Sequence, residues 1–271
     1  MLYGALAPLY DRLMAHVGYH RWQDVVEQVI RRFGRSVKPS ILEIGAGTGL
    51  LAQRLRGSGC RYVASDLSPD MCSLARTRVS QVVCADGRSL PFRSSAYFDL
   101  VLFLYDGINY LIEKECWDRL FVEVHSRLSQ GGLFLFDVTT EFNSINNFSE
   151  YVDADDFGDC FYFRHSYYHA RQSFQFNDFT IFRRCGKADG IRTAPSATRD
   201  SRDHEQRLEC DETALYTKSL EHHKQKVFPI GVIRGFVPDS LFEVLGVWDD
   251  FSLKKYTPRS ERVHFLLRKK E

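Results

Sequence analysis

The sequence predicts an α/β fold, a mostly parallel β-sheet with helices on both faces, together with an antiparallel β-rich insertion. Two observations carry this prediction. Short apolar runs and helical patterns alternate through the first half of the chain, as they do where crossover helices join parallel strands. Beyond residue 140, phenylalanine and tyrosine gather in two stretches with patches of alternation, a pattern typical of antiparallel strands.

The strands of the parallel sheet are expected where apolar runs lie between turn signals. They cover residues 41–44, 61–65, 82–85, 100–104 and 133–136. Apolar residues at helical spacing predict the intervening helices, which cover 21–33 and 50–55, start again after Ser68-Pro69-Asp70, and include Trp117 to Leu128. Serine as N-cap and proline in the first turn mark the third of these helices. This order of elements predicts a Rossmann-like sheet.

The second half divides less clearly. Strands are expected at 160–170 and 173–184, further strands within 208–226, a helix at 238–245, and final strands at 251–256 and 263–268. Residues 186–206 lose nearly all large apolar side chains and predict a mobile loop. The expected division is N-terminal lid helices at 1–36, a Rossmann-like core at 37–140 and 231–271, and a β-rich substrate cap at 141–230.

Composition excludes several classes of function. The 271 residues carry a formal net charge of +1, which gives no strong field for nucleic acid or an anionic membrane. Seven cysteines are widely spaced, which favours free thiols in a reducing compartment over a metal centre or redox motif. No secretory pattern or membrane-spanning apolar run is present, so we expect a cytoplasmic protein.

The glycine-rich turn after the first predicted strand is the most informative motif. It reads Glu43-Ile44-Gly45-Ala46-Gly47-Thr48-Gly49. Glycines here let a ligand approach the backbone. The G-x-G-x-G spacing differs from that of dinucleotide enzymes, and the Glu43 carboxylate two positions earlier disfavours a pyrophosphate. A ligand with a cationic amino group and a sulfonium fits this charge.

Acidic residues also end the next two predicted strands. Asp66 lies about 20 residues beyond the glycines, where a carboxylate can bind ribose hydroxyls. Asp86, followed by Gly87, ends the third strand and is placed to meet an adenine amine. Three acids in this order, each at the carboxyl end of its strand, predict a nucleoside site.

These segments resemble the successive motifs of class I S-adenosylmethionine-dependent methyltransferases. The matching stretches are ILEIGAGTGL, VASDLSPDM, VCADGRSLPF and FDLVLFLYDGINYL. The resemblance implies S-adenosylmethionine as cofactor and S-adenosylhomocysteine as product. It places Gly45, Gly47 and Gly49 at the methionine part and Asp66 at the ribose, with Leu67, Met71, Asp86 and Gly87 around the adenine, and Phe103 and Leu104 beneath the ligand.

The N-terminal run YDRLMAHVGYHRW resembles the lid helix of small-molecule N-methyltransferases of the amino-sugar and glycine type. Members of that subgroup also insert antiparallel strands after the fifth strand. The resemblance makes Tyr10, Tyr19 and Trp22 candidates to cover the cofactor, with ordinary helix packing as the alternative.

Methyl transfer from a sulfonium depends chiefly on positioning, and it needs a base only if the acceptor must lose a proton. The best catalytic candidates are Asp106, to bind an amine, and Tyr110, to orient an acceptor, both in the loop after the fourth strand. Tyr110 aligns with a histidine that resembles a general base in amino-sugar enzymes. A capping aspartate and a packing tyrosine are the structural alternatives.

Alternation places His165, Tyr167 and His169 on one strand face, where packing is favoured over lining a pocket. His222-His223 lacks a third ligand, and no metal is expected.

The function predicted is therefore methyl transfer to a small-molecule amine or hydroxyl by a monomer or homodimer. Alternatives are a methyltransferase acting on a protein or tRNA and a catalytically silent, cofactor-binding regulator. A nicotinamide oxidoreductase is disfavoured by the glycine spacing and Glu43.

Overall fold

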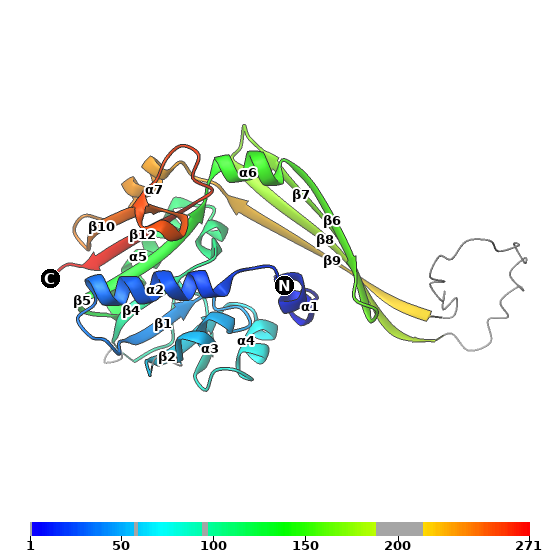
Figure 1. Cartoon of the computed structure of the whole chain (residues 1–271), viewed down its shortest axis with the longest axis horizontal. Coiled ribbons are helices and arrows are strands. Elements are labelled where there is room, and N and C mark those ends of the chain that lie inside the picture. The colour runs from blue at the N-terminus through cyan, green and yellow to red at the C-terminus, as the bar shows by residue number, and fades with distance from the viewer. Residues whose placement is uncertain (1, 57–58, 94–96, 188–213) are drawn as a thin grey trace, which may run out of the picture.

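A computed structural model describes the chain except residue 1 and residues 57–58, 94–96 and 188–213. The described residues form an α/β core and a four-stranded sheet that extends from it as an arm (Figure 1). No helix within them is long and apolar enough to cross a membrane.

The core is an eight-stranded sheet with the order β11-β10-β12-β5-β4-β1-β2-β3. Its parallel part consists of β1 (Ser40–Ile44), β2 (Arg61–Asp66), β3 (Val82–Cys84), β4 (Phe98–Phe103) and β5 (Leu128–Thr139). Its antiparallel edge consists of β12 (Arg262–Lys269), β10 (Phe242–Asp249) and β11 (Lys254–Lys255). The predicted Rossmann-like sheet is confirmed.

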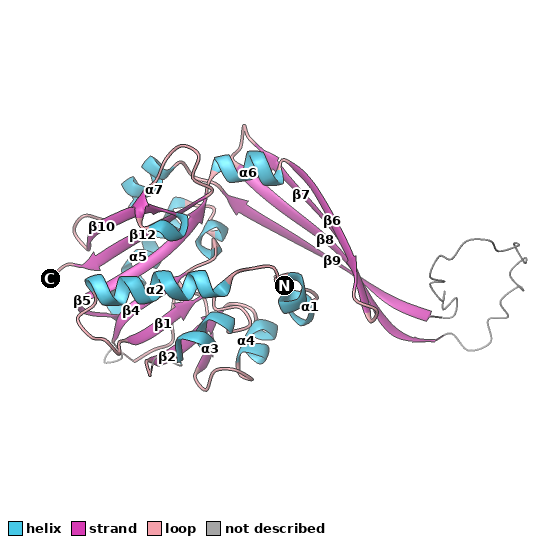
Figure 2. Ribbon diagram, in the orientation of Figure 1, coloured by secondary structure: helices cyan, strands magenta, loops and turns pink. Residues whose placement is uncertain are grey.

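Helices cover both faces of this sheet (Figure 2). They are α2 (Tyr19–Phe33), α3 (Leu50–Arg56), α4 (Pro69–Ala75), α5 (Lys114–Arg127) and α7 (Ile230–Phe236). On one face Trp117 of α5 and Ile233 of α7 pack in one buried apolar cluster, and on the other Trp22 of α2 and Leu51 of α3 pack in a second. The α4 N-terminus has the predicted cap, because the Ser68 hydroxyl accepts a hydrogen bond from Met71 N–H.

Strand β5 shows why the parallel strands read as continuous apolar runs. Phe134 and Phe136 point into the cluster under α5, while Leu133 and Leu135 point into the cluster under α2. Because both faces of the sheet are covered, both sets of side chains must be apolar.

The arm is an antiparallel sheet with the order β6-β7-β8-β9. Its strands are β6 (Glu150–Asp156), β7 (Cys160–His169), β8 (Phe174–Lys187) and β9 (Ala214–Lys226), and α6 (Glu141–Phe148) precedes them. The predicted strands 160–170 and 173–184 are therefore present as β7 and β8. The predicted mobile loop 186–206 begins within β8 and lies outside the described residues from residue 188 on, as do residues 208–213.

Helix α1 (Ala7–Leu13) lies between the core and the arm (Figure 1). Leu6 and Leu9 pack with Tyr162 and Phe179 of the arm. On the core side, the Thr48 hydroxyl donates a 2.5 Å hydrogen bond to Asp11. The N-terminal segment is thereby fixed to both parts of the molecule.

Two predictions near the C-terminus are wrong. Residues 238–245 do not form a helix, since Phe242–Asp249 is strand β10, paired with β12. Apolar residues at 241, 242, 245 and 248 have helical spacing, but the free edge of β12 provides backbone partners that override it. Residues 251–256 form only the two-residue β11, because the 3₁₀ turn η2 (Asp250–Ser252) occupies the start of that segment.

His264 of β12 gives a stability prediction. Burial among Trp22 and Phe251 lowers its pKa to about 3, so the unfolded chain binds a proton first as pH falls. The free energy of unfolding should then fall by about 1.4 kcal/mol per pH unit between about pH 6 and pH 4. In His264→Leu this contribution should disappear, as urea unfolding at several pH values would show.

His20→Gln, at an exposed position of α2, is the control and should keep the wild-type dependence. An unchanged pH dependence in His264→Leu would contradict the prediction.

Candidate functional site

The glycine-rich turn follows β1 and leaves its carboxyl end open to a ligand. Gly45 and Gly47 have φ of 66° and 56°, a region that side chains with a Cβ disfavour. A Cβ on Gly45 would lie 2.9 Å from the Phe103 ring, whereas one on Gly47 would meet nothing nearer than the Tyr10 ring at 4.0 Å. The space beside Gly47 is therefore open to a ligand, and the Tyr10 ring bounds it.

Asp66, at the end of β2, lies beside this turn. Its Oδ2 accepts a 2.8 Å hydrogen bond from Gly47 N–H, and its Oδ1 accepts one of 2.8 Å from Ser68 N–H. Burial raises the pKa of this carboxyl, and these backbone hydrogen bonds oppose the rise. Both oxygens keep lone pairs that can accept hydroxyl donors. Leu67 beside it is 60% exposed, an apolar side chain available to cover a flat ring.

Asp86 follows β3, and its carboxylate is paired with Arg88. Its Oδ1 accepts a 2.9 Å hydrogen bond from Arg88 Nε, and Oδ2 accepts one of 2.5 Å from Arg88 Nη2. This pairing lowers the pKa of the Asp86 carboxyl. Gly87 next to it leaves no room for a side chain, since a Cβ would lie 2.6 Å from Ile44 Cγ2.

A single cavity of about 730 Å³ joins these features. Its wall includes most of the predicted site residues, namely Tyr10, Gly45, Gly47, Asp66, Leu67, Met71, Asp86, Gly87, Phe103, Leu104, Asp106 and Tyr110. These come from the carboxyl ends of four parallel strands, from the helical turns that follow two of them, and from α1. The volume is typical of a small-molecule site.

Three predicted residues, Glu43, Ala46 and Gly49, are not part of this wall. The Glu43 side chain is buried and accepts a 2.8 Å hydrogen bond from Tyr62 Oη. Burial raises its pKa to about 8 despite that hydrogen bond. Ala46 N–H donates to Ser65 O at 2.9 Å. Glu43 and Ala46 therefore stabilise the turn from the side that faces away from the cavity.

The loop after β4 has an unusual backbone. Tyr105 and Asp106 have φ of 63° and 49°, a left-handed conformation that costs a residue with a side chain about 1 kcal/mol or more. Asp106 N–H donates a 3.0 Å hydrogen bond to Asp137 Oδ2 on β5, which holds the loop in place. Strain of this kind recurs at functional sites.

The Asp106 carboxylate is bound by two partners that the sequence did not reveal. Oδ1 accepts a 2.8 Å hydrogen bond from Arg262 Nη1 of β12, and Oδ2 accepts one of 2.7 Å from Gln225 Nε2 of β9. Arg262 also pairs with Asp137. Burial raises the pKa of Asp106, and the Arg262 charge opposes this. Asp106 is thus hydrogen-bonded within the protein, and its role as an amine-binding group stays a prediction.

Tyr110, in the 3₁₀ helix η1 (Gly107–Tyr110), joins a hydrogen-bonded group. Its Oη lies 2.8 Å from Tyr3 Oη and 2.9 Å from His223 Nδ1, and His223 Nε2 lies 3.2 Å from Glu221 Oε2. Sequence reasoning missed Tyr3 and Glu221 and considered His223 only as a metal ligand. The alternation of Glu221, His223 and Gln225 along one strand face was the available signal.

The face of the arm that meets the cavity is polar. Its buried polar residues are Ser166, Gln175, Asn177, Glu221, His223 and Gln225. Arg164 lies among them, with Nη2 2.7 Å from Asn177 Oδ1 and Nε 2.8 Å from Ser166 Oγ. Buried polar groups on a cavity wall provide hydrogen bonds to a polar ligand.

His165, Tyr167 and His169 point to the opposite face of the arm. Tyr167 stacks on Phe176 with ring centroids 5.0 Å apart, and His165 lies 2.8 Å from Glu150. These residues do not line the cavity.

Of the three proposed lid aromatics, Tyr10 alone is in the cavity wall. Trp22 is buried against Tyr105 and Phe251, and Tyr19 stacks on Tyr105 at 6.5 Å. Trp22 and Tyr19 therefore support the strained loop from the α2 side.

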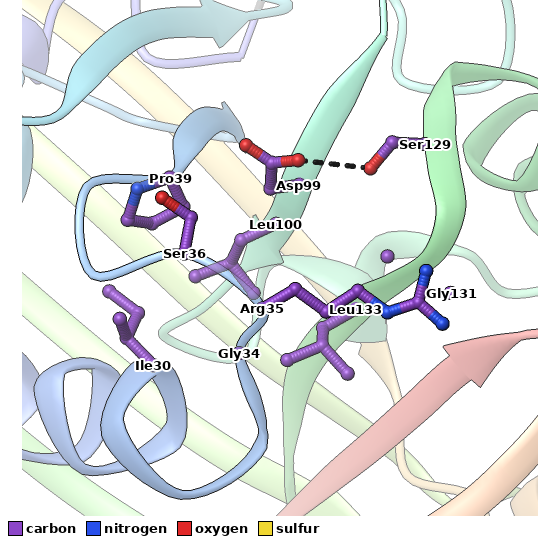
Figure 3. A pocket seen from close by; sticks show the side chains of 11 residues that line it. Ile30, Gly34, Arg35, Ser36, Pro39, Asp99, Leu100, Ser129, Gly131 and Leu133 are labelled. Atoms are coloured by element: carbon purple, nitrogen blue, oxygen red, sulfur yellow. Dashed lines mark hydrogen bonds between the residues drawn. The ribbon is translucent and has the colours of Figure 1, made fainter.

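A second pocket lies at the opposite, amino-terminal ends of the parallel strands, lined by Pro39, Asp99 and Ser129 among others (Figure 3). Its volume of about 20 Å³ holds little more than one water molecule. The Ser129 hydroxyl donates to Asp99 Oδ1 at 3.1 Å across it. This pocket is too small for a metabolite.

The chain is similar in sequence and in fold to known methyltransferases. Residues 41–132 match a model of the methyltransferase domain. YqeM of Bacillus subtilis (strain 168), whose description as a methyltransferase is provisional, is 27% identical over 274 residues, 99% of this chain and 98% of its own.

Solved structures extend the likeness of fold to the whole chain. An S-adenosylmethionine-dependent methyltransferase from Clostridium acetobutylicum ATCC 824 superposes with a TM-score of 0.75 at 22% identity, over 99% of both chains. The sugar N-methyltransferase KedS8 from Streptoalloteichus sp. ATCC 53650 gives 0.68 at 17% identity, over 97% of this chain and 93% of its own. The match identifies residues 41–132 as a methyltransferase domain, and the whole chain has the fold of S-adenosylmethionine-dependent methyltransferases.

Proposed function

We propose that this methyltransferase acts on the amine or hydroxyl group of a small, polar acceptor. One observation carries the proposal: a single cavity of about 730 Å³ runs from the glycine-rich turn to the buried polar face of the arm. A cofactor bound at the turn and a metabolite bound at the arm would share this space. The sugar N-methyltransferase fold of KedS8 supports the same class of acceptor.

The cofactor half of the cavity fits S-adenosylmethionine, which supplies an electrophilic methyl group when bound. We propose that Gly45 and Gly47 admit its methionine part, that Asp66 accepts hydrogen bonds from the ribose, and that Leu67 and Met71 contact the adenine. The open space over Gly47 and the free lone pairs of Asp66 support this assignment. Tyr10 on α1 would cover the ligand and exclude water.

The acceptor half belongs to the arm, and we propose that residues 141–230 form the substrate cap and residues 1–36 the lid. Arg164 carries a positive charge whose hydrogen-bond partners, Ser166 and Asn177, are neutral. It lines the cavity with Asn177, and its charge reaches Tyr110. Arg164 and Asn177 would orient a polar acceptor toward the methyl group. We also propose a cytoplasmic enzyme, monomeric or homodimeric.

Asp66→Asn should weaken the binding of S-adenosylhomocysteine at least about tenfold. It removes the charge from hydrogen bonds that are worth roughly 1.5–3 kcal/mol each. Calorimetric titration of the purified protein measures the change.

Asp70→Asn is the matched control, because Asp70 lies four residues further on at an exposed position of α4, and it should bind like the wild type. Equal affinity of the Asp66→Asn and wild-type proteins would contradict the assignment of Asp66.

Methyl-labelled S-adenosylmethionine tests the acceptor class directly. Incubated with the enzyme and separate pools of metabolites, proteins and tRNA, the label should enter a compound of the metabolite pool. A heat-inactivated sample provides the background. Label found only in protein or tRNA would overturn the small-molecule proposal.

Arg164→Gln should raise the KM for that acceptor about tenfold or more, because it removes a charged donor from the cavity wall. The affinity for S-adenosylhomocysteine should stay within about twofold. Arg171→Gln, exposed in the turn between β7 and β8, is the control and should change neither quantity. If Arg164→Gln weakened the binding of S-adenosylhomocysteine and left the KM for the acceptor unchanged, Arg164 would be assigned to the cofactor site instead.

A further inference from the structure

Four side chains form a continuous hydrogen-bonded chain at the acceptor half of the cavity. Tyr3 Oη lies 2.8 Å from Tyr110 Oη, which lies 2.9 Å from His223 Nδ1, and His223 Nε2 lies 3.2 Å from Glu221 Oε2. Tyr3, Tyr110 and His223 are part of the cavity wall. His223 is only 2% exposed, so bulk water does not complete its hydrogen bonds.

The partners of Glu221 determine which nitrogen of His223 carries the proton. Glu221 also accepts hydrogen bonds from Leu6 N–H at 2.8 Å and Tyr3 N–H at 3.0 Å. Burial alone would raise the pKa of Glu221, but its hydrogen bonds, that from His223 foremost, lower it. A carboxylate only accepts hydrogen bonds, so neutral His223 must donate from Nε2–H. Its Nδ1 is then free to accept the Tyr110 proton.

We propose that His223, held by Glu221, is the terminal proton acceptor of the reaction and is reached through the Tyr110 hydroxyl. This inference rests on the proposed function and narrows it, because an acceptor that needs such a relay presents a hydroxyl or a protonated amine.

The step balances as follows. The O–H or N–H bond of the acceptor breaks, and its proton passes to Tyr110 Oη. The original Tyr110 proton passes to His223 Nδ1, which gives an imidazolium beside the Glu221 carboxylate. The freed lone pair of the acceptor bonds to the transferred methyl carbon, and the electrons of the carbon–sulfur bond remain on sulfur. His223 later releases its proton to solvent.

Neighbouring groups do not offer a better base. Burial raises the pKa of Tyr110 further above its ordinary value of 10, so the phenol passes a proton on and does not keep a negative charge. Asp106 is bound by Arg262 and Gln225. The charges of Asp106 and Arg164 also act on Tyr110, the first raising its pKa and the second lowering it. An imidazole with its own carboxylate is the usual arrangement for a general base near neutral pH.

Nitrogen NMR of histidine-labelled protein with bound S-adenosylhomocysteine is the first test, and it does not depend on the acceptor. We expect His223 as the Nε2–H tautomer near neutral pH, both in the wild type and in Tyr110→Phe. A persistent Nδ1–H tautomer would overturn the relay, because that nitrogen would be unable to take up a proton.

Kinetics with the acceptor from the metabolite pool form the second test. His223→Gln should lower kcat by about 10²- to 10⁴-fold, with S-adenosylhomocysteine binding within twofold of the wild type. The wild-type rate should decline at acid pH, and in the variant that decline should be replaced by a rate that rises steadily with pH. Tyr110→Phe should lose a similar factor in kcat, which keeps the test valid if His223→Gln fails to fold.

His165 gives a control on the opposite face of the arm. Its side chain is 38% exposed and lies 2.8 Å from Glu150, away from the cavity wall, so His165→Gln should leave kcat and its pH profile unchanged. If His223→Gln binds S-adenosylhomocysteine and keeps the wild-type kcat and pH profile, the relay is wrong and the methyltransferase assignment stands. If the wild type itself binds no S-adenosylhomocysteine, the proposed function fails first.

Discussion

The largely buried ion group of Arg262, Asp106 and Asp137 is the interaction on which the site depends. Arg262 comes from the last strand, Asp137 from β5, and Asp106 from the loop after β4. Loss of one partner from such a buried group typically costs about 3–5 kcal/mol, because an uncompensated charge remains. Here it would also release the left-handed backbone at Tyr105 and Asp106 that leads to Tyr110. The conformation of this loop therefore depends on the charge of Arg262, which lies far along the chain.

The same group connects the core to the arm. Gln225 of β9 donates to Asp106, and Asn109 Nδ2 donates to the Lys226 carbonyl at 2.9 Å. From that attachment, β9 presents Gln225, His223 and Glu221 to the cavity in succession, since alternate residues share a face. Glu221 then binds the backbone of the N-terminal segment at Tyr3 and Leu6. The core, the arm and the N-terminal segment thus meet along one short stretch of strand.

Much of the cofactor half was predictable from sequence. Glycines at fixed spacing and acids at strand ends act through backbone geometry and local order, so the residue pattern is enough to place Gly45, Gly47, Asp66 and Asp86 at one edge of a sheet. The direction of the Glu43 side chain was not predictable in the same way, because the sequence does not show on which face of the sheet it lies. In the structure it accepts a hydrogen bond from Tyr62. The helix predicted at 238–245 was wrong because pairing with β12, a contact between distant segments, outweighed the local helical spacing.

The sequence by itself determined the fold class, the succession of the parallel strands along the chain and the position of the glycine-rich turn, because these depend on short-range patterns and on the rules for crossover connections. The tertiary structure alone decided which groups line the half of the cavity that we assign to the acceptor. Tyr3 and Tyr110, and Tyr110 and His223, are each separated by more than a hundred residues, and their hydrogen bonds exist only because the N-terminal segment and β9 pack beside the loop after β4. No local pattern encodes such contacts, since they depend on how separate elements pack in space.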